Sequence, residues 1–165
     1  IALEATLDTP LGLLRVTTTH LEYYSATQRG AQVQRLRELQ REGAAHARAT
    51  RKGAAAAGPF ESFARGGPSI LCGDFNCLPG SKDHAALLAP FDDATPRYAD
   101  AWALLHPGVP HAPSVGLYDK RQWPQPPFTF DFFFVSEDLA PRLRELVVDQ
   151  DSAASDHQPV LLRLA

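Results

Sequence analysis

Gly73-Asp74-Phe75-Asn76 and Ser155-Asp156-His157-Gln158 are the two stretches of this sequence that decide its fold. Each sets short polar side chains beside an apolar run, Ile70-Leu71-Cys72 before the first and Val160-Leu161-Leu162 after the second. A buried strand can hold the polar side chains at its end in one fixed place, and carboxylate and amide oxygens suit a hard cation such as Mg²⁺. A site shared by both stretches requires a fold that brings two strand ends together.

Three further segments complete an ordered set. Thr18-Thr19-His20-Leu21 closes an alternating strand, Asp100-Ala101-Trp102 opens a helix-like segment, and Phe130-Asp131-Phe132 begins an aromatic strand that runs to Ser136. Together with the first two stretches, in this order, they resemble the endonuclease/exonuclease/phosphatase superfamily, whose fold is deoxyribonuclease-I-like. The resemblance runs from about Leu13 to Leu164, which is nearly the whole chain.

The resemblance implies an α/β fold, as part of a deoxyribonuclease-I-like α/β sandwich with a mixed, mostly antiparallel sheet and covering helices. Family members begin with a strand that ends in Asn and continue to a strand with a metal-binding Glu, and no such segments precede Ile1. We therefore expect residues 1–165 to be a single partial domain, the C-terminal half, with the N-terminal half absent. This half would supply one sheet and its helices.

Composition and charge bound the class of protein. The 165 residues are 44% hydrophobic and 21% charged, which is ordinary for one globular domain with a core. The net charge of -3 argues against a nonspecific DNA-binding enzyme, because such proteins usually present a basic face. No apolar run has the length of a transmembrane segment. The compartment stays unknown, with a soluble, cytoplasmic protein as the expectation.

Of the two cysteines, Cys72 lies in the apolar strand before Asn76 and Cys77 comes directly after Asn76. A disulfide would require both side chains to face each other across a short turn. Nothing else in the sequence resembles a disulfide framework, so we expect free thiols.

Periodicity predicts strands that alternate with helices, which is typical of an α/β protein. Residues 3–7 and 13–21 read as a hairpin, and Ser25 as the cap of a helix that buries Val33 and Leu36. Residues 43–67 either extend this helix or form a surface loop. The remaining expected elements are strands at 69–75, 128–136, 147–148 and 158–164, helices at 81–88, 99–105 and 137–146, and a loop at 108–127 beside the site.

Asp74 and Asn76 stand two residues apart, so on an extended strand both would face one pocket. The resemblance implies that Asp74 orients the attacking water and that Asn76 holds a phosphate oxygen. The alternative is a turn in which both side chains only cap the backbone. The resemblance also places His20 across the pocket, as a donor to the phosphate, although a histidine there could equally be a surface residue.

Asp156 and Asp74 are the metal ligands that the resemblance implies, and His157 is the general acid or base. Asp131 lies among phenylalanines, where an unpaired carboxylate is costly, so we expect it to pair with His157. The alternative for Asp131 is an exposed place on a strand edge. The remaining histidines receive no site role; they are His46, His84, His106 and His111. Of these, we expect His84 to be solvated.

The family resemblance implies a hydrolase of phosphoester bonds that depends on Mg²⁺, with Mn²⁺ and Ca²⁺ as alternatives. The substrate would be a nucleic acid, a phospholipid head group or a small phosphodiester. Without the family's Glu, Mg²⁺ should bind weakly. Two alternatives stay open: a non-catalytic half-domain that covers its apolar sheet face by forming a homodimer, and a module that binds phosphorylated ligands without turnover.

Overall fold

Five strands form the central sheet of the computed structural model, which describes residues 1–50 and 63–165. Their spatial order is β1-β2-β3-β5-β4, and every neighbouring pair is antiparallel except β2 and β3. The mostly antiparallel mixed sheet is therefore confirmed. The strands are β1 (Ala2–Thr9), β2 (Gly12–His20), β3 (Ser69–Asp74), β4 (Tyr98–Asp100) and β5 (Asp131–Ser136).

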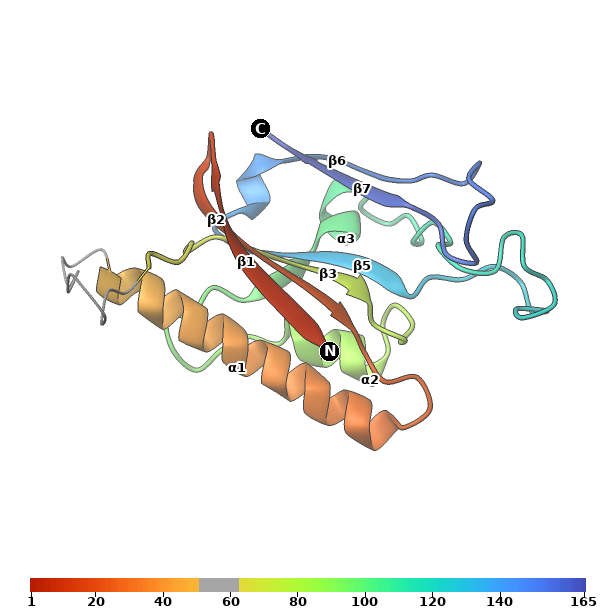
Figure 1. Cartoon of the computed structure of the whole chain (residues 1–165), viewed down its shortest axis with the longest axis horizontal. Coiled ribbons are helices and arrows are strands. Elements are labelled where there is room, and N and C mark those ends of the chain that lie inside the picture. The colour runs from red at the N-terminus through yellow and green to blue at the C-terminus, as the bar shows by residue number, and fades with distance from the viewer. Residues whose placement is uncertain (51–62) are drawn as a thin grey trace.

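Two helices, α1 (Ala26–Thr50) and α2 (Lys82–Leu88), cover one face of this sheet (Figure 1). The predicted core residues Val33 and Leu36 of α1 are buried against the sheet. Ser81 caps α2 as expected, since its side chain accepts a hydrogen bond from the His84 N–H. Of the two alternatives for residues 43–67, the structure has the helix extension as far as Thr50, and the stretch 51–62 lies outside the described residues.

A second, two-stranded sheet lies over the opposite face (Figure 1). It consists of β6 (Leu143–Val148) and β7 (Val160–Leu164), and α3 (Ala101–Leu105) packs beside it. The expectation of one sheet is therefore wrong, and so is the expectation that the last strand closes the central sheet. The apolar side chains between the two sheets form a core of their own; its buried members include Leu14, Ile70, Trp102, Val135 and Leu146.

The prediction of a helix over residues 137–146 is also wrong. Only a short 3-10 helix forms, η1 (Ala140–Arg142), and β6 follows it directly. Pro141 lacks the N–H that a longer helix would need at this point, and residues 143–148 gain a strand partner in β7. A tertiary pairing that the local sequence does not reveal thus overrides the helical pattern. At 99–105 the helix is confirmed only from Ala101, because β4 includes Asp100.

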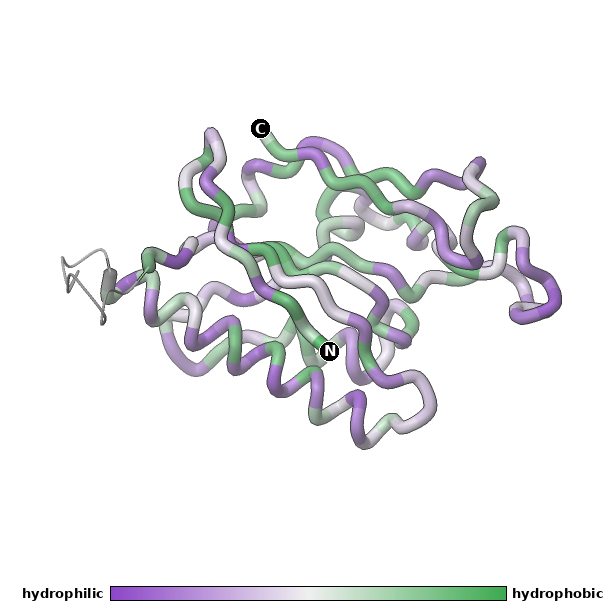
Figure 2. Tube along the Cα trace, in the orientation of Figure 1, coloured by the Kyte–Doolittle hydropathy of each residue, from purple (hydrophilic) through white to green (hydrophobic). Residues whose placement is uncertain are grey.

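The edge strand β1 keeps apolar side chains in solvent. Leu3 is 70% exposed and Leu7 is 47% exposed. Both lie on the face of the sheet that packs against β6 and β7, but those two strands cover the other strands of the sheet and not β1. Figure 2 shows this strand as partly green at the surface, while α1 alternates between green and purple. None of the described helices combines the length and the apolar character needed to cross a bilayer.

Strand register places three of the expected site residues in one row. His20 pairs with Asp74 across β2 and β3, and Asp74 pairs with Asp131 across β3 and β5. Gly73 stands beside this row with φ +132, and a Cβ atom there would overlap the Thr19 carbonyl oxygen. Glycine is thus required for the close approach of β2 and β3 next to Asp74.

Candidate active site

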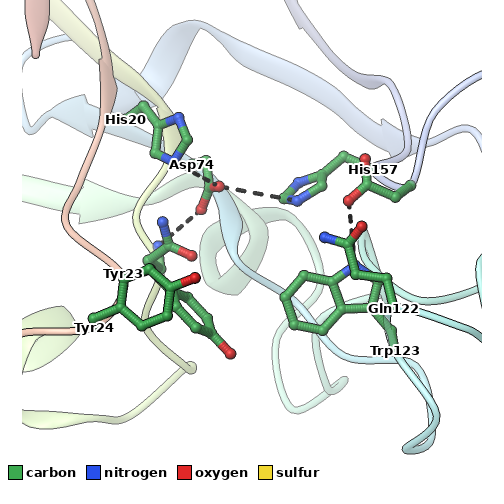
Figure 3. Close-up of a pocket in the computed structure, with 9 residues that line it drawn as sticks. His20, Tyr23, Tyr24, Asp74, Gln122, Trp123 and His157 are labelled. Carbon is green, nitrogen blue, oxygen red and sulfur yellow. Dashed lines mark hydrogen bonds and ion pairs between the residues drawn. The ribbon is translucent and has the colours of Figure 1, made fainter.

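The row of His20, Asp74 and Asp131 ends in an open pocket of about 620 Å³ (Figure 3). Polar residues from β2, β3 and the segment before β7 line one part of it, and aromatic side chains line the rest. The polar residues of this part are His20, Asp74, Asn76, Asp156 and His157, and Gln122 lines the pocket as well. Every expected site residue except Asp131 therefore lines this one pocket, and Asp131 lies directly behind it in contact with His157.

Asp74 lies between two imidazole rings (Figure 3). Its Oδ2 is 3.5 Å from Nε2 of His20 and 3.9 Å from Nε2 of His157. Burial raises the pKa of Asp74 above its usual range, although the Asn76 N–H that donates to Oδ1 opposes the shift. A carboxylate that is costly to keep charged is a good proton acceptor, so Asp74 is suited to take a proton from water.

His157 and Asp131 form the expected pair. Nδ1 of His157 is 2.8 Å from Oδ2 of Asp131, so the imidazole donates its Nδ1–H to the carboxylate and directs Nε2 toward Asp74. This hydrogen bond raises the pKa of His157, and partial burial of the ring opposes the rise. The pair therefore favours a protonated imidazole whose free N–H faces the pocket.

Ser114 also contacts Asp131, and the sequence reasoning missed it. This fully buried side chain donates to Oδ2 of Asp131 at 2.7 Å and accepts the N–H of Asp131 at 3.2 Å. The neighbouring Val115 forms isolated bridges with both Phe128 and His157, which hold the segment against the site. A serine in a loop carries no periodic signal, so only the three-dimensional contact identifies it.

The geometry of Asn76 differs from the expectation of an extended strand. β3 ends at Asp74, and Asn76 has a left-handed backbone with φ 48. Its side chain is buried and donates through Nδ2 to the carbonyl of Leu21 at 2.9 Å, which fixes the segment after β2. Phe75 points into the core, as expected. Asn76 thus lines the pocket through a turn that also orders its neighbouring loop.

Asp156 receives a hydrogen bond from an aromatic side chain. Nε1–H of Trp123 donates to its Oδ2 at 3.2 Å, and this bond lowers the pKa of Asp156. Trp123 and Gln122 belong to the 108–127 loop, whose expected place beside the site is confirmed. The indole therefore keeps Asp156 charged and limits its rotation.

The donor set fits a hard divalent cation. Two of the residues that line the pocket are acidic, Asp74 and Asp156, and no lysine or arginine is among the described residues that line it. A phosphate group bound here would be repelled by the two carboxylates, and the imidazoles are the only lining side chains among the described residues that can carry positive charge. Oxygen ligands of this kind suit Mg²⁺, which takes one or two carboxylates and completes its shell with water and substrate oxygens.

A separate histidine–aspartate cluster lies at the β4 edge of the sheet. Oδ2 of the buried Asp100 is 2.9 Å from Nε2 of His84 and 2.8 Å from Nε2 of His111. Among the described residues, these three form the one group of metal-ligand type whose donor atoms all lie within 4.8 Å of one another. His84 is 7% exposed, so its expected solvation is wrong. The Gly80 N–H points to Nδ1 of His84, so Nε2 carries the proton and donates it to Asp100.

Both cysteines are free thiols, as expected. Burial raises the pKa of the Cys77 thiol to about 11, and burial also raises the pKa of Cys72. Neither side chain is therefore suited to act as a nucleophile near neutral pH.

Comparison with known proteins agrees with this architecture. The profile described as the Endonuclease/Exonuclease/phosphatase family matches residues 7–157. No curated protein sequence matches the chain. The prediction that the chain corresponds to the second half of a longer domain stays a prediction, because the family profile covers most of the chain.

Solved structures with a similar fold share little sequence. A mannosyl-6-phosphatase from Bacteroides thetaiotaomicron VPI-5482 is 17% identical with a TM-score of 0.57, and the match covers 93% of this chain and 51% of that one. A functionally unknown conserved protein from Enterococcus faecalis V583 is 18% identical with a TM-score of 0.62, over 99% and 55% of the two chains. An endonuclease/exonuclease/phosphatase family protein from Bacteroides thetaiotaomicron is 16% identical with a TM-score of 0.57, over 92% and 48%. The chain thus spans about half the length of these structures.

Proposed function

The chain belongs to the endonuclease/exonuclease/phosphatase family, and from this we propose that it contributes the catalytic site of a divalent-metal-dependent phosphoester hydrolase. One observation carries the proposal. The row of His20, Asp74 and Asp131 ends in the same pocket as His157 and Asp156. Two imidazoles and two carboxylates therefore line one space, and this supports assigning a proton donor and a proton acceptor to it.

The side chains divide the proton transfers between them. Asp74 accepts a proton from the water whose oxygen attacks phosphorus. As the bond to the leaving oxygen breaks, protonated His157 gives its Nε2 proton to that oxygen. Asp131 stabilises the imidazolium through Nδ1–H and fixes the orientation of the ring. His20, which is on the other side of Asp74, donates a hydrogen bond to a phosphoryl oxygen.

Asp74 and Asp156 would hold Mg²⁺, with Mn²⁺ or Ca²⁺ as substitutes. When bound, the cation neutralises charge on the phosphoryl oxygens and lowers the pKa of a coordinated water. Trp123 supports this role from behind by orienting the Asp156 carboxylate. A cation beside Asp74 would favour its charged form through opposite charge and so offset the burial that raises its pKa.

Small phosphoesters fit this pocket better than a nucleic acid polymer. The chain has a net charge of -3, and no lysine or arginine is among the described lining residues that could follow a phosphate backbone. The structural likeness to a mannosyl-6-phosphatase adds support for a phosphomonoester of a small molecule. A phospholipid head group or a small phosphodiester would present the same phosphate.

The test is hydrolysis of chromogenic phosphate mono- and diesters with Mg²⁺ and with chelator. We expect turnover that chelator abolishes and that excess Mg²⁺ restores. Loss of a residue that only orients a metal ligand typically costs roughly 10- to 100-fold in metal affinity. Asp156→Ala removes a ligand itself, so the Mg²⁺ concentration that gives half-maximal rate should rise by at least this factor. Turnover unaffected by chelator, or no turnover at any Mg²⁺ concentration, would contradict the proposal for this chain.

A second candidate is a non-catalytic domain that self-associates, and the exposed apolar edge of the sheet favours it. Leu3 is 70% exposed on β1, whose outer backbone groups are available for pairing with another strand. Size-exclusion chromatography with light scattering separates the cases. A dimer without turnover supports this candidate, and a monomer with chelator-sensitive turnover rules it out.

A further inference from the structure

Three aromatic side chains line the pocket beside its polar residues. Tyr23 and Tyr24 follow β2 on one side, and Trp123 comes from the 108–127 loop on the other (Figure 3). The ring centroids of Tyr23 and Tyr24 are 5.0 Å apart, and those of Tyr23 and Trp123 are 6.1 Å apart, both in edge contact. The rings thus form a continuous apolar wall next to Asp74 and His157.

The wall is supported from behind. Trp123 packs against Phe128 at 5.3 Å and against Phe130 at 6.3 Å, and Tyr23 packs against Phe130 at 6.2 Å. The hydrogen bond from Trp123 to Asp156 fixes the indole in its plane. Tyr24 is different, since its side chain is 92% exposed and gains little from the protein core. A rigid aromatic surface with an exposed tyrosine at its rim is typical of a ligand-binding site.

We propose that Tyr23, Tyr24 and Trp123 form a subsite for a ring carried by the alcohol part of the phosphoester. The inference rests on the proposed function, which places the phosphate among Asp74, His157 and Asp156. A ring one or two bonds from that phosphate reaches the aromatic wall, where it stacks or presents C–H groups to the π faces. The pocket volume of about 620 Å³ holds such a molecule.

Direct binding measurements test the subsite without requiring turnover. The chain has two tryptophans, and Trp102 is 9% exposed in α3, so a ligand that quenches fluorescence in the pocket does so through Trp123. The probes are phenyl phosphate, glucose 6-phosphate and ethyl phosphate, each titrated with Mg²⁺ present into the His157→Gln variant, so that hydrolysis does not consume the probe. We expect at least one ring-bearing probe to bind about tenfold more tightly than ethyl phosphate, as one stacked ring contributes elsewhere.

The pattern across the probes separates the possible results. Preference for phenyl phosphate identifies a flat ring, and preference for glucose 6-phosphate identifies a pyranose; both support the subsite. Ring preference without hydrolysis overturns the proposed function and leaves the subsite standing. Equal binding of all three probes, or binding of none, overturns the subsite, while chelator-sensitive hydrolysis with equal binding keeps the proposed function.

Two variants assign the preference to the rings. Tyr24→Ala removes the most exposed ring, and calorimetry should show the affinity ratio of the preferred ring-bearing probe to ethyl phosphate falling by roughly tenfold. Trp123→Phe removes the N–H donated to Asp156 but keeps an aromatic face, so this ratio should largely persist. An unchanged ratio in Tyr24→Ala would remove Tyr24 from the subsite.

Discussion

Replacing His157 with glutamine should lower the rate of phosphoester hydrolysis by about 10²- to 10⁴-fold, the usual contribution of a general acid or base. The glutamine amide takes the place of Nε2 of His157, so the pocket keeps an N–H donor and Asp131 keeps the hydrogen bond from Ser114, but the amide cannot transfer a proton. Binding of a phosphate ester should change little, since Asp74, Asp156 and the aromatic wall remain. Steady-state kinetics and calorimetry on the same preparation measure both quantities.

Asp131→Asn is the matched variant, because it keeps the side-chain shape and removes the charge. The hydrogen bond to Asp131 is the main cause of the raised pKa of His157, so this pKa should fall in the variant. Catalysis by protonated His157 is lost as pH rises through that pKa, and the alkaline limb of the rate profile should therefore move to lower pH. An unchanged rate in His157→Gln would show instead that another group supplies the proton.

Replacing Asp100 with alanine should lower the free energy of unfolding by roughly 3–5 kcal/mol, because each buried donor left without an acceptor costs about 1–3 kcal/mol and a helix cap is lost as well. Asp100 accepts from the N–H groups of Trp102 and Ala103 through Oδ1, and from His84 and His111 through Oδ2. Alanine leaves these donors without an acceptor and also removes the cap of α3. Urea unfolding monitored by circular dichroism measures the loss.

The pH dependence of this loss distinguishes a charged partner from simple packing. Burial alone would raise the pKa of Asp100, but the hydrogen bonds from His111 and His84 outweigh it and hold the pKa well below the usual range. The contribution of Asp100 should therefore be complete above about pH 4, the ordinary pKa of aspartate, and fall as pH drops below it. Asp138→Ala, an exposed control, should change stability by about 0.5 kcal/mol or less. Equal effects of the two substitutions would contradict the assignment.

The sequence predicted best those residues that stand at the ends of strongly apolar strands. His20 and Asp74 end such strands and Asp131 begins one. The predicted ends of the strands therefore also gave the positions of these side chains. The pair between Asp131 and His157 followed from the cost of burying a lone carboxylate, and the structure confirms the contact. In these cases local pattern and tertiary structure agree, as they do for the hairpin of β1 and β2.

Failures occurred where a distant partner decides the structure. Residues 143–148 become a strand only because β7 pairs with them, and His84 is buried only because Asp100 comes from the neighbouring strand. Ser114 and Trp123 orient Asp131 and Asp156 from the long loop, where no periodicity shows which side a residue faces. Asn76 departs from an extended strand because the chain turns with positive φ directly after β3.

The row of His20, Asp74 and Asp131 also sets when the pocket can exist during protein synthesis. Its strand pairs join distant parts of the chain, and His157 follows all three residues in the sequence. Contacts between residues so far apart form slowly, because long loops must close first. A nascent chain that has not reached His157 therefore holds Asp74 and Asp131 without their shared partner.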